Sequence, residues 1–283
     1  MDRAKILAEA LPYIKKYSGK TVVVKYGGSA MKGSELFTAV MGDLVLLSLV
    51  GIRLVVVHGG GPEINEALES SGIKSRFVNG LRYTDKETMG VVQMVLCGKV
   101  NKSLVDTINR TGGNAIGFCG IDGGILKARK LVETDGTEYG YVGSIVDVAP
   151  GPINLALDGG YIPVVATVAT GVDGDTAYNI NADTVASKLA IALKAEKLIL
   201  LTDVKGLMLN PMNMDTLLEE VRLNEIPSLV KDGVISGGMI PKVDCCVEAI
   251  RRGVNSANIC DGRVPHSVLI EMLTDTGTGT MIY

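Results

Sequence analysis

The chain has 283 residues, a length that suggests one large or two modest domains with a substantial hydrophobic core. Hydrophobic residues make up 47% of the sequence and charged residues 21%, which excludes a disordered or collagen-like protein. The formal net charge of −3, from 28 basic and 31 acidic residues, gives no reason to expect nucleic acid as a partner. No apolar run approaches the ~20 residues of a membrane span, and the N-terminus has no signal-type apolar segment, so we expect a cytoplasmic protein without membrane contact.

The cysteines and histidines argue against a metal site. Five cysteines without CxxC spacing favour unpaired thiols in a reducing compartment. With only His58 and His266 available, a histidine-based zinc site would need carboxylate partners that no local pattern supplies. We therefore expect no metal held by the protein's own side chains.

Strands and helices are expected to alternate along the chain. Short β-branched runs that end in glycine or a polar residue predict buried strands at 21–28, 52–61, 114–124, 161–169 and 197–206. Apolar residues at helical spacing predict helices between them, at 35–50, 62–71, 84–102, 184–193 and 241–252. This alternation predicts an α/β fold, a three-layer sandwich with a mainly parallel central sheet and helices on both faces, and it directs ligands to the carboxyl ends of the strands.

Two local patterns refine this outline. Thr84 and Glu87 have the spacing of a capping box at a helix start. Segment 127–148 breaks the alternation and predicts a hairpin that turns at Asp135-Gly136. A turn-rich stretch before the next helix suggests a boundary near residue 178, which would divide the chain into lobes 1–178 and 179–283.

Lys25 is the first candidate for a chemical role. It ends an otherwise apolar strand and precedes Gly27 and Gly28. Burial of an ammonium group at such a strand end costs free energy unless the group is paired. A fixed cation beside exposed backbone N–H groups suits phosphate oxygens, and a lysine that extends to water is the alternative. The glycines at 59–61 repeat this arrangement after a second strand, at a helix start that attracts anionic oxygens; a simple tight turn is the alternative there.

Four further polar residues stand at element ends. Lys242 lies in the first turn of a helix, where the dipole disfavours a cation by on the order of 0.3–1 kcal/mol unless an anion binds; a solvent-screened lysine is the alternative. Asp183 begins a helix and can serve simply as its cap. Arg82 suits a carboxylate ligand or is an ordinary surface arginine. Asp203 ends a strand; it either belongs to a turn at the edge of a nucleotide site or simply caps the end of the strand.

An ordered set of segments along nearly the whole chain resembles the amino acid kinase family. The segments are KYGGSAM (25–31), VVHGGGPEI (56–64), NGLRYTD (79–85), GKVNK (98–102), GFCGIDG (117–123), YNINAD (178–183), AEKLILLTDVKG (195–206), SGGMIPKV (236–243) and GTGTMI (277–282). The resemblance implies an ATP-dependent kinase. NGLRYT and YNINAD imply that its acceptor is the side-chain carboxylate of N-acetyl-L-glutamate, in arginine biosynthesis. That carboxylate, with a pKa of about 4.3, is already ionised and needs no general base.

The resemblance also implies roles for individual residues. Lys25 and Lys242 would stabilise the transferring phosphoryl group, and Asp183 would orient both ammonium groups. Acetylglutamate would be held by Gly60, Gly61, Arg82, Asn179 and Asn181, and lobe 1–178 would bind it and form the dimer. Lobe 179–283 would bind ATP, with nucleotide contacts from Gly28, Asp203, Gly206, Ser236 and Gly238 and with Mg²⁺ carried by the phosphates.

The N-terminal stretch raises the question of regulation. It places apolar side chains on one helical face, at Ile6, Leu7, Ala10, Leu11, Ile14 and Tyr17. This face packs on its own domain or, as in arginine-inhibited members of the family, joins dimers into a hexameric ring. The resemblance implies a homo-oligomer, dimer or hexamer, with arginine as feedback inhibitor at a site formed by Tyr13, Lys197, His266 and Glu271.

Three questions of function stay open at this point. The acceptor could be another amino-acid carboxylate, such as aspartate, glutamate or an aminoadipate derivative. The chain could instead be a non-catalytic arginine sensor that keeps the fold. A signalling protein of the PII type could dock on the ring.

Overall fold

The computed structural model describes residues 3–27, 34–174, 176–210 and 213–283. Within these ranges the largest element is an eight-stranded sheet with the order β12-β14-β13-β11-β1-β2-β8-β5. Its parallel strands are β1 (Thr21–Tyr26), β2 (Arg53–His58), β5 (Ala115–Cys119), β8 (Ile162–Ala166), β11 (Lys197–Thr202) and β13 (Ser256–Asp261). The other two, β12 (Glu220–Val221) and β14 (Thr280–Ile282), run in the opposite direction.

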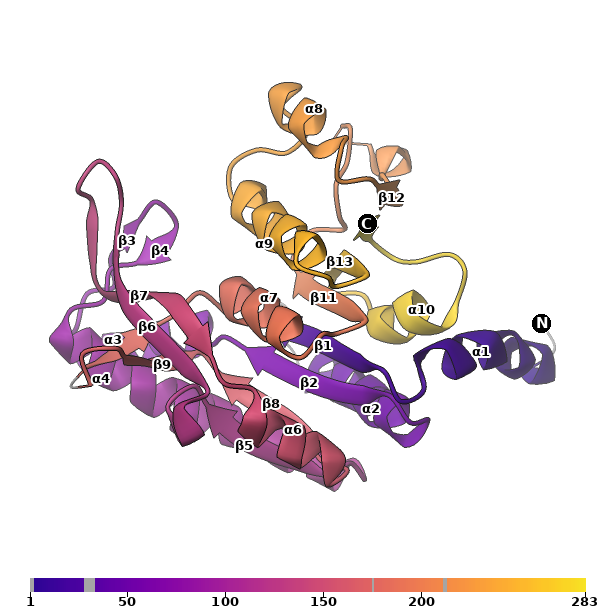
Figure 1. The fold of residues 1–283 in the computed structure, drawn as a ribbon, viewed down its shortest axis with the longest axis horizontal. Helices are drawn as coiled ribbons and strands as arrows, with labels where there is room; N and C mark the ends of the chain where they lie inside the picture. The colour runs from indigo at the N-terminus through magenta and orange to yellow at the C-terminus, as the bar shows by residue number, and fades with distance from the viewer. Residues whose placement is uncertain (1–2, 28–33, 175, 211–212) are drawn as a thin grey trace.

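Both faces of the sheet are buried, because side chains alternate along each strand. In β1, Val22 and Val24 belong to one hydrophobic core and Val23 to the other. The first core is covered by α2 (Ser34–Leu49), α4 (Lys86–Gln93), α5 (Asn101–Arg110) and α10 (Ser267–Leu273). The second is covered by α6 (Gly151–Asp158), α7 (Ala182–Ala192) and α9 (Met239–Arg251), which lie in front of the sheet in Figure 1. The predicted α/β sandwich with a mainly parallel sheet is confirmed.

A small barrel stands at the end of the sheet to which β2 points, on the left of Figure 1. It closes through β6 (Leu126–Val132), β7 (Glu138–Val148), β9 (Val168–Gly171) and β10 (Ala177–Asn179). Strands β6 and β7 pair antiparallel, so the hairpin predicted at 127–148 is confirmed. A second, short hairpin of β3 (Phe77–Val78) and β4 (Leu81–Arg82) lies beside it.

The helix predicted at 84–102 begins later and runs further. It continues from α4 through a π-helical stretch, η2 (Met94–Val100), into α5. The capping-box prediction is wrong by one residue: the Asp85 carboxylate accepts from the backbone N–H of Thr88 and caps α4. Thr84 is not available as a cap because it is buried, bridges to Gly140, and donates its hydroxyl to the Arg82 carbonyl.

The predicted lobes share the central sheet. The proposed boundary at residue 178 falls inside β10, and β1 from the first lobe lies directly beside β11 from the second. The sequence analysis did not predict three helices, namely α6, α8 (Ile226–Lys231) and α10, nor the strands β3, β4, β10, β12, β13 and β14. These are runs of two to eight residues, which contain few apolar positions from which a period can be recognised.

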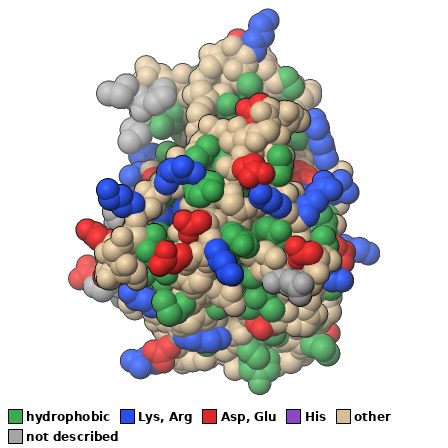
Figure 2. Space-filling model, turned by 90° about the vertical axis from the view of Figure 1, so that its left-hand side faces the viewer, with side chains coloured by type: hydrophobic (Ala, Val, Ile, Leu, Met, Phe, Trp, Pro, Cys, Tyr) green, Lys and Arg blue, Asp and Glu red, His purple; other side chains and the backbone are tan. Residues whose placement is uncertain are grey.

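The surface of the molecule carries both apolar and charged side chains. Helix α1 (Arg3–Tyr17) extends past the edge of the sheet (Figure 1); its Tyr17 is buried, whereas Leu11 is 64% exposed. On the face drawn in Figure 2, acidic and basic side chains are interspersed. No helix in the described ranges is both long enough and apolar enough to cross a bilayer.

Candidate active site

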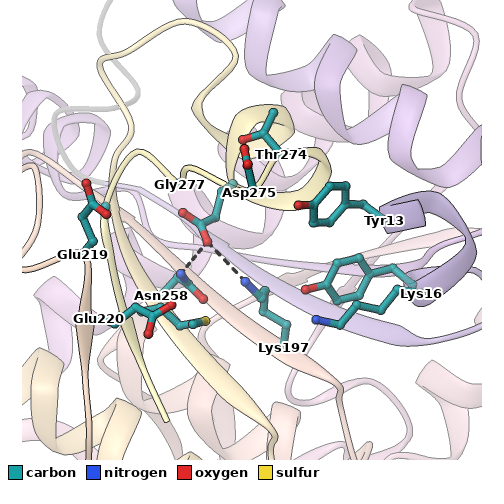
Figure 3. A pocket seen from close by; sticks show the side chains of 13 residues that line it. Tyr13, Lys16, Lys197, Glu219, Glu220, Asn258, Thr274, Asp275 and Gly277 are labelled. Atoms are coloured by element: carbon teal, nitrogen blue, oxygen red, sulfur yellow. Dashed lines mark hydrogen bonds and ion pairs between the residues drawn. The ribbon is translucent and has the colours of Figure 1, made fainter. Parts of the chain in front are cut away.

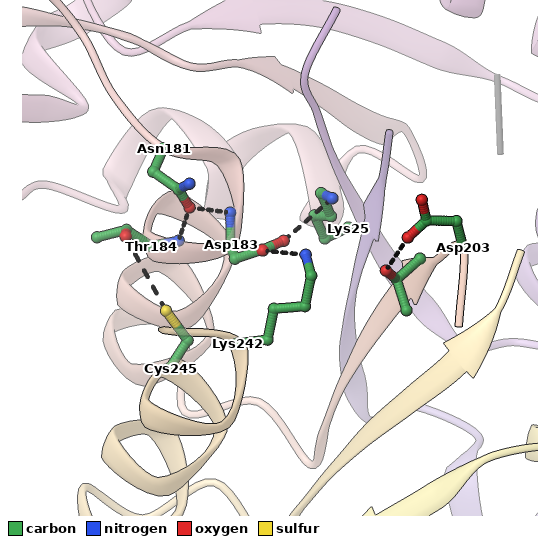
Figure 4. Close-up of polar contacts among 8 residues, drawn as sticks. Lys25, Asn181, Asp183, Thr184, Asp203, Lys242 and Cys245 are labelled. Atoms are coloured by element: carbon green, nitrogen blue, oxygen red, sulfur yellow. Dashed lines mark hydrogen bonds and ion pairs between the residues drawn. The ribbon is translucent and has the colours of Figure 1, made fainter. Parts of the chain in front are cut away.

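Two lysines and one aspartate, far apart in the sequence, meet beyond the carboxyl ends of the strands. Lys25 lies near the end of β1, Asp183 in the first turn of α7 and Lys242 in the first turn of α9. The Lys25 Nζ is 3.1 Å from Asp183 Oδ1, and the Lys242 Nζ donates to Asp183 Oδ2 at 2.7 Å. Each ammonium group therefore occupies one oxygen of the same carboxylate, as Figure 4 shows.

Asp183 is free for this task because another residue caps α7. The Asn181 side-chain oxygen accepts from the backbone N–H groups of Asp183 and Thr184, at 2.9 and 3.2 Å. The alternative that Asp183 serves simply as the helix cap is thus wrong. With Asn181 as the cap, Asp183 is the second residue of the helix, and its carboxylate is directed at the lysines.

The electrostatics of this cluster favour an additional anion. Asp183 is 6% exposed, and burial acts to raise its pKa, but the ammonium groups of Lys25 and Lys242 outweigh burial and hold the pKa below its usual value. The carboxylate is therefore ionised at neutral pH. Two cations facing one anion leave one positive charge uncompensated, and the N-terminus of α9 adds to the positive potential. A phosphoryl group would supply the missing negative charge.

The residues expected to hold acetylglutamate come together in a cavity of about 170 Å³. It lies where the turn after β2 meets β10 and the start of α7, and its lining includes Gly60, Gly61, Arg82, Asn179 and Asn181. Gly60 is the N-cap residue of α3 (Gly61–Ser70), so the cavity opens on a helix N-terminus. A Cβ on Gly60 would lie 2.8 Å from Leu96 Cδ2, so a larger residue at this position would require Leu96 to shift.

Arg82 is a fixed, largely buried cation. It is 8% exposed, and its guanidinium donates to the Ser75 hydroxyl and to the Gly61 carbonyl, the latter at 3.3 Å. The guanidinium carbon also lies 4.8 Å from the centroid of the Phe77 ring. Burial lowers the pKa of Arg82. The reading of Arg82 as an ordinary surface arginine is therefore wrong.

A larger cavity of about 680 Å³ adjoins the first one. Its lining includes Asp183, Lys242, Gly237 and Gly238, and it shares Asn181 with the smaller cavity. Lys242 and Asp183 line the larger cavity directly, and Lys25 adjoins it through its 3.1 Å contact with Asp183. The lysines therefore lie beside the larger cavity, near the residues that it shares with the smaller one.

The expected nucleotide residues are less tightly grouped. Gly238 lines the larger cavity, whereas Asp203, Gly206 and Ser236 line neither cavity. In Figure 4, Asp203 follows the end of β11 on the far side of Lys25 from Asp183, where its carboxylate accepts from Thr202. Gly206 has a φ of 145° and approaches Thr280 closely, which requires glycine for structural reasons alone. Gly28 lies outside the described residues.

Three of the four residues expected to bind arginine line a third cavity, of about 260 Å³ (Figure 3). Tyr13 reaches it from α1, Lys197 from β11 and Glu271 from α10. The Lys197 Nζ donates to Glu271 Oε1 at 3.2 Å, and both side chains are more than nine-tenths buried. His266, the N-cap residue of α10, does not line this cavity. Its side chain contacts α2 instead, where its Nδ1 lies 2.6 Å from Asp43 Oδ1.

Some cavity residues escaped the sequence analysis. Asn79 and Tyr139 face the larger cavity and are joined by a 3.1 Å hydrogen bond from the Asn79 amide to the tyrosine hydroxyl. Asn79 stands three residues before Arg82, so the same motif could have indicated it. Tyr139 gave no local signal, because closure of the barrel brings it to the site.

Comparison with known proteins shows which family the chain resembles. The model of the amino acid kinase family matches residues 20–261. The acetylglutamate kinase of Clostridium beijerinckii is 57% identical over 282 residues, covering 100% of this chain and 98% of that relative. Two solved structures are of the N-acetylglutamate synthase from Neisseria gonorrhoeae. One is a complex with coenzyme A and N-acetylglutamate (TM-score 0.87, 28% identity) and the other a complex with coenzyme A and L-arginine (TM-score 0.83, 26% identity).

This chain spans only 63% and 65% of those two synthase chains, although they cover all of it. The match to the kinase relatives, by contrast, runs the full length of both partners. From the family model and these full-length matches, the chain belongs to the amino acid kinase family.

Proposed function

We propose that this chain transfers the γ-phosphoryl group of ATP to the side-chain carboxylate of N-acetyl-L-glutamate, in the cytoplasm and as a step of arginine biosynthesis. The observation that carries the proposal is the Lys25–Asp183–Lys242 cluster, of which Asp183 and Lys242 line the larger cavity next to the smaller one. The acetylglutamate kinases at 52–57% identity support this choice of acceptor.

The reaction requires alignment of the two anionic substrates and stabilisation of the negative charge on the transferring phosphoryl group. A carboxylate oxygen forms a bond to the γ-phosphorus while the bond to the β-phosphate oxygen breaks, and no proton has to move. Two anions must approach each other, so cations fixed between them lower the barrier. We assign Lys25 to the transferring phosphoryl and Lys242 to the leaving side, with Asp183 holding both ammonium groups in place.

The smaller cavity would take the acceptor. Arg82 offers a guanidinium for the α-carboxylate, since its position is already fixed by Ser75 and Gly61. The amides of Asn179 and Asn181 and the backbone N–H groups at Gly60 and Gly61 would hold the remaining polar atoms, because these residues line the same cavity.

The larger cavity would take the part of ATP next to Gly238 and Lys242. Gly28, Asp203, Gly206 and Ser236 would contact the nucleotide outside the lining of that cavity. Each oxygen of Asp183 lies within ion-pair distance of one ammonium group, which favours a role in orienting the lysines over metal coordination. We therefore treat Mg²⁺ as part of the MgATP substrate, bound to phosphate oxygens and water, where it reduces the negative charge of the nucleotide.

Acceptor specificity provides the direct test. The purified chain is supplied with MgATP and, in separate reactions, acetylglutamate, glutamate, aspartate and aminoadipate, and the acyl phosphate is trapped with hydroxylamine. We expect acetylglutamate to give the product with much the highest kcat/KM. A higher kcat/KM for another acceptor would identify that compound as the substrate. If none of the acceptors gave a product, the chain would instead be a non-catalytic sensor.

For the third cavity we propose arginine as ligand and feedback inhibitor. Tyr13, Lys197 and Glu271 line it, and a carboxylate beside an amine-bearing side chain suits the two charged ends of an amino acid. The related synthase structure with L-arginine supports the choice of ligand. Because α1 provides one wall of the cavity and exposes Leu11, we further propose that it contributes to a homo-oligomer, dimer or hexamer.

Arginine titration tests this regulatory site. We expect inhibition in the wild type and weaker inhibition in Glu271→Gln, with Asp106→Asn, an exposed carboxylate on α5, as the matched control. Absence of inhibition at millimolar arginine would refute the proposal. Sedimentation of Leu11→Glu against the wild type tests the role of α1, since an unchanged oligomer would exclude that helix from the interface.

A further inference from the structure

His58 is a buried group to which the chemistry above gives no task. It is the last residue of β2, its side chain is fully buried, and it is paired in register with Tyr26 and Ala166. Burial lowers its pKa to about 4; a hydrogen bond to Gly59 opposes this effect and nearby Lys102 adds to it. The imidazole is therefore neutral at physiological pH, with its single proton on one of two distinct nitrogens.

The surroundings of Asn101 decide which nitrogen carries that proton. The Asn101 Nδ2 lies 2.9 Å from the Val164 carbonyl oxygen and 3.2 Å from that of Phe118. The Asn101 Oδ1 lies 3.1 Å from the Lys102 Nζ. Carbonyl oxygens only accept and an ammonium group only donates, so this orientation of the amide is the one that satisfies all three neighbours.

The same amide nitrogen lies 3.1 Å from the His58 Nε2. The amide nitrogen has two N–H groups for these three acceptors and accepts no hydrogen bond itself, so a proton on Nε2 would find no partner there. The Gly59 carbonyl oxygen, which only accepts, lies 2.9 Å from Nδ1, so the proton of His58 is on Nδ1 and is donated to that oxygen. Gly117 makes this arrangement possible, because a Cβ there would lie 2.0 Å from Asn101 Oδ1.

This hydrogen bond sets the direction of one peptide group in the substrate turn. In a trans peptide the C=O and the following N–H point in opposite directions, and none of the described residues is joined by a cis bond. With the Gly59 carbonyl drawn toward His58 in the interior, the Gly60 N–H is turned away from it. Gly59 and Gly60 both line the cavity assigned to the acceptor.

We propose that His58, held by Asn101 in its Nδ1–H form, is a positioning residue that directs the Gly60 N–H toward the oxygens of the bound substrates. This rests on the proposed function, because it gives the turn a ligand to serve. His58 does not touch the reacting atoms; it acts through the Gly59–Gly60 peptide.

The tautomer can be tested without any assay of activity. The chain contains only two histidines, so ¹⁵N-histidine spectra of the wild type and of His58→Gln assign both rings. We expect the His58 ring to keep a protonated Nδ1 and an unprotonated Nε2 throughout pH 5–8. A protonated Nε2, or a titration within that range, would overturn the proposal.

Two substitutions separate the two hydrogen bonds of the ring. His58→Asn keeps a donor near Nδ1 for the Gly59 carbonyl, whereas His58→Gln keeps an acceptor near Nε2 for Asn101 but loses that donor. We expect kcat/KM for acetylglutamate to fall about tenfold further in His58→Gln than in His58→Asn, the ratio that corresponds to one hydrogen bond. The KM for ATP should be similar in both variants.

A control outside the site accounts for lost stability. Asn109→Ala removes the two hydrogen bonds that Asn109 exchanges with Ala115, between α5 and β5, and should lower Tm while leaving both KM values unchanged. Equal kinetics in the two His58 variants would overturn the positioning role. Failure of the wild type to phosphorylate acetylglutamate would contradict the proposed function alone, since the tautomer is measured independently.

Discussion

A buried carboxylate between two ammonium groups is the central feature at the scale of single residues. Asp183 neutralises one of the two charges and leaves the other for a ligand. Both lysines are thereby held in position before any ligand arrives, which reduces the reorganisation needed during phosphoryl transfer.

Replacing either lysine should affect turnover more than binding. We expect kcat to fall by about 10²–10³-fold in Lys25→Ala and in Lys242→Ala, as on removal of one oxyanion donor. Steady-state kinetics would measure this, with Lys188→Ala as control, since Lys188 forms a 2.6 Å ion pair with Glu248 between the same two helices, α7 and α9. Near-normal kcat in a lysine variant would remove that lysine from the chemistry.

Arg82 should determine acceptor affinity. Because its guanidinium lines the smaller cavity and is absent from the lining of the larger one, Arg82→Ala should raise the KM for acetylglutamate at least tenfold and change the KM for ATP little. Initial-rate measurements with each substrate varied in turn would check this. The reverse pattern would assign Arg82 to the nucleotide.

Residues that conflict with their local surroundings could be identified from the sequence. Lys25 attracted attention as a charge at the end of an apolar strand, and Lys242 as a cation at the wrong end of a helix. Tyr139 could not be identified in this way, because only the closure of β6, β7, β9 and β10 brings it to the cavity.

At the scale of elements, the turn after β2 is held from two sides. His58 binds the Gly59 carbonyl from within the sheet, and the π-helical stretch η2 packs Leu96 and Val100 against Gly60. The turn is therefore rigid although it consists of glycines, and its shape depends on the helix beneath it.

Enlarging Gly60 should disturb this packing. A Cβ would lie 2.8 Å from Leu96 Cδ2 and 3.1 Å from Val100 Cγ2, so Gly60→Ala must shift these side chains or the turn. We expect a lower Tm and a several-fold lower kcat/KM for acetylglutamate. Gly42→Ala in α2 is the control, since its Cβ meets no atom within 4 Å and Ala is the better helix former by roughly 0.5–1 kcal/mol. Thermal unfolding and kinetics of both variants would decide.

The sequence located long elements better than their ends. The period of the apolar residues revealed the helix from residue 84, but its cap is Asp85 because Thr84 takes part in a bridge to Gly140, a contact between segments distant in the chain. The π-helical stretch could not be predicted either, because the spacing of apolar residues does not reveal which backbone carbonyl accepts from each N–H group.

For the whole molecule, His58 links stability to pH. Its pKa is about 4 in the folded chain against about 6.5 when unfolded, so between these values the unfolded state binds more protons. Stability therefore falls as the pH drops from about 6.5 toward 4. Asp183 acts below this window, because its lowered pKa gives stability that is lost only as the pH falls under the usual aspartate value.

Denaturant unfolding at pH 7 and pH 5 would measure this dependence. We expect the free energy of unfolding of the wild type to be lower at pH 5 by on the order of 1 kcal/mol. In His58→Gln, which cannot titrate, the difference between the two pH values should shrink. An equal difference in both proteins would show that His58 titrates alike in the folded and unfolded states.

The fold class could be predicted because glycine-terminated strands and intervening helices report a covered parallel sheet directly. The arrangement of the two predicted lobes could not, because the pairing of β1 with β11 joins segments more than a hundred residues apart. The division into an acceptor lobe and a nucleotide lobe stays a prediction.

The strand order also affects how the protein is made. Among the described residues, strand β12 joins the sheet only through β14, which lies far downstream in the sequence and is inserted between β12 and β13. While the chain is being synthesised, β12 has no neighbour to pair with until residues 280–282 have left the ribosome. This edge of the sheet, beside β13, therefore pairs only after β14 has been synthesised.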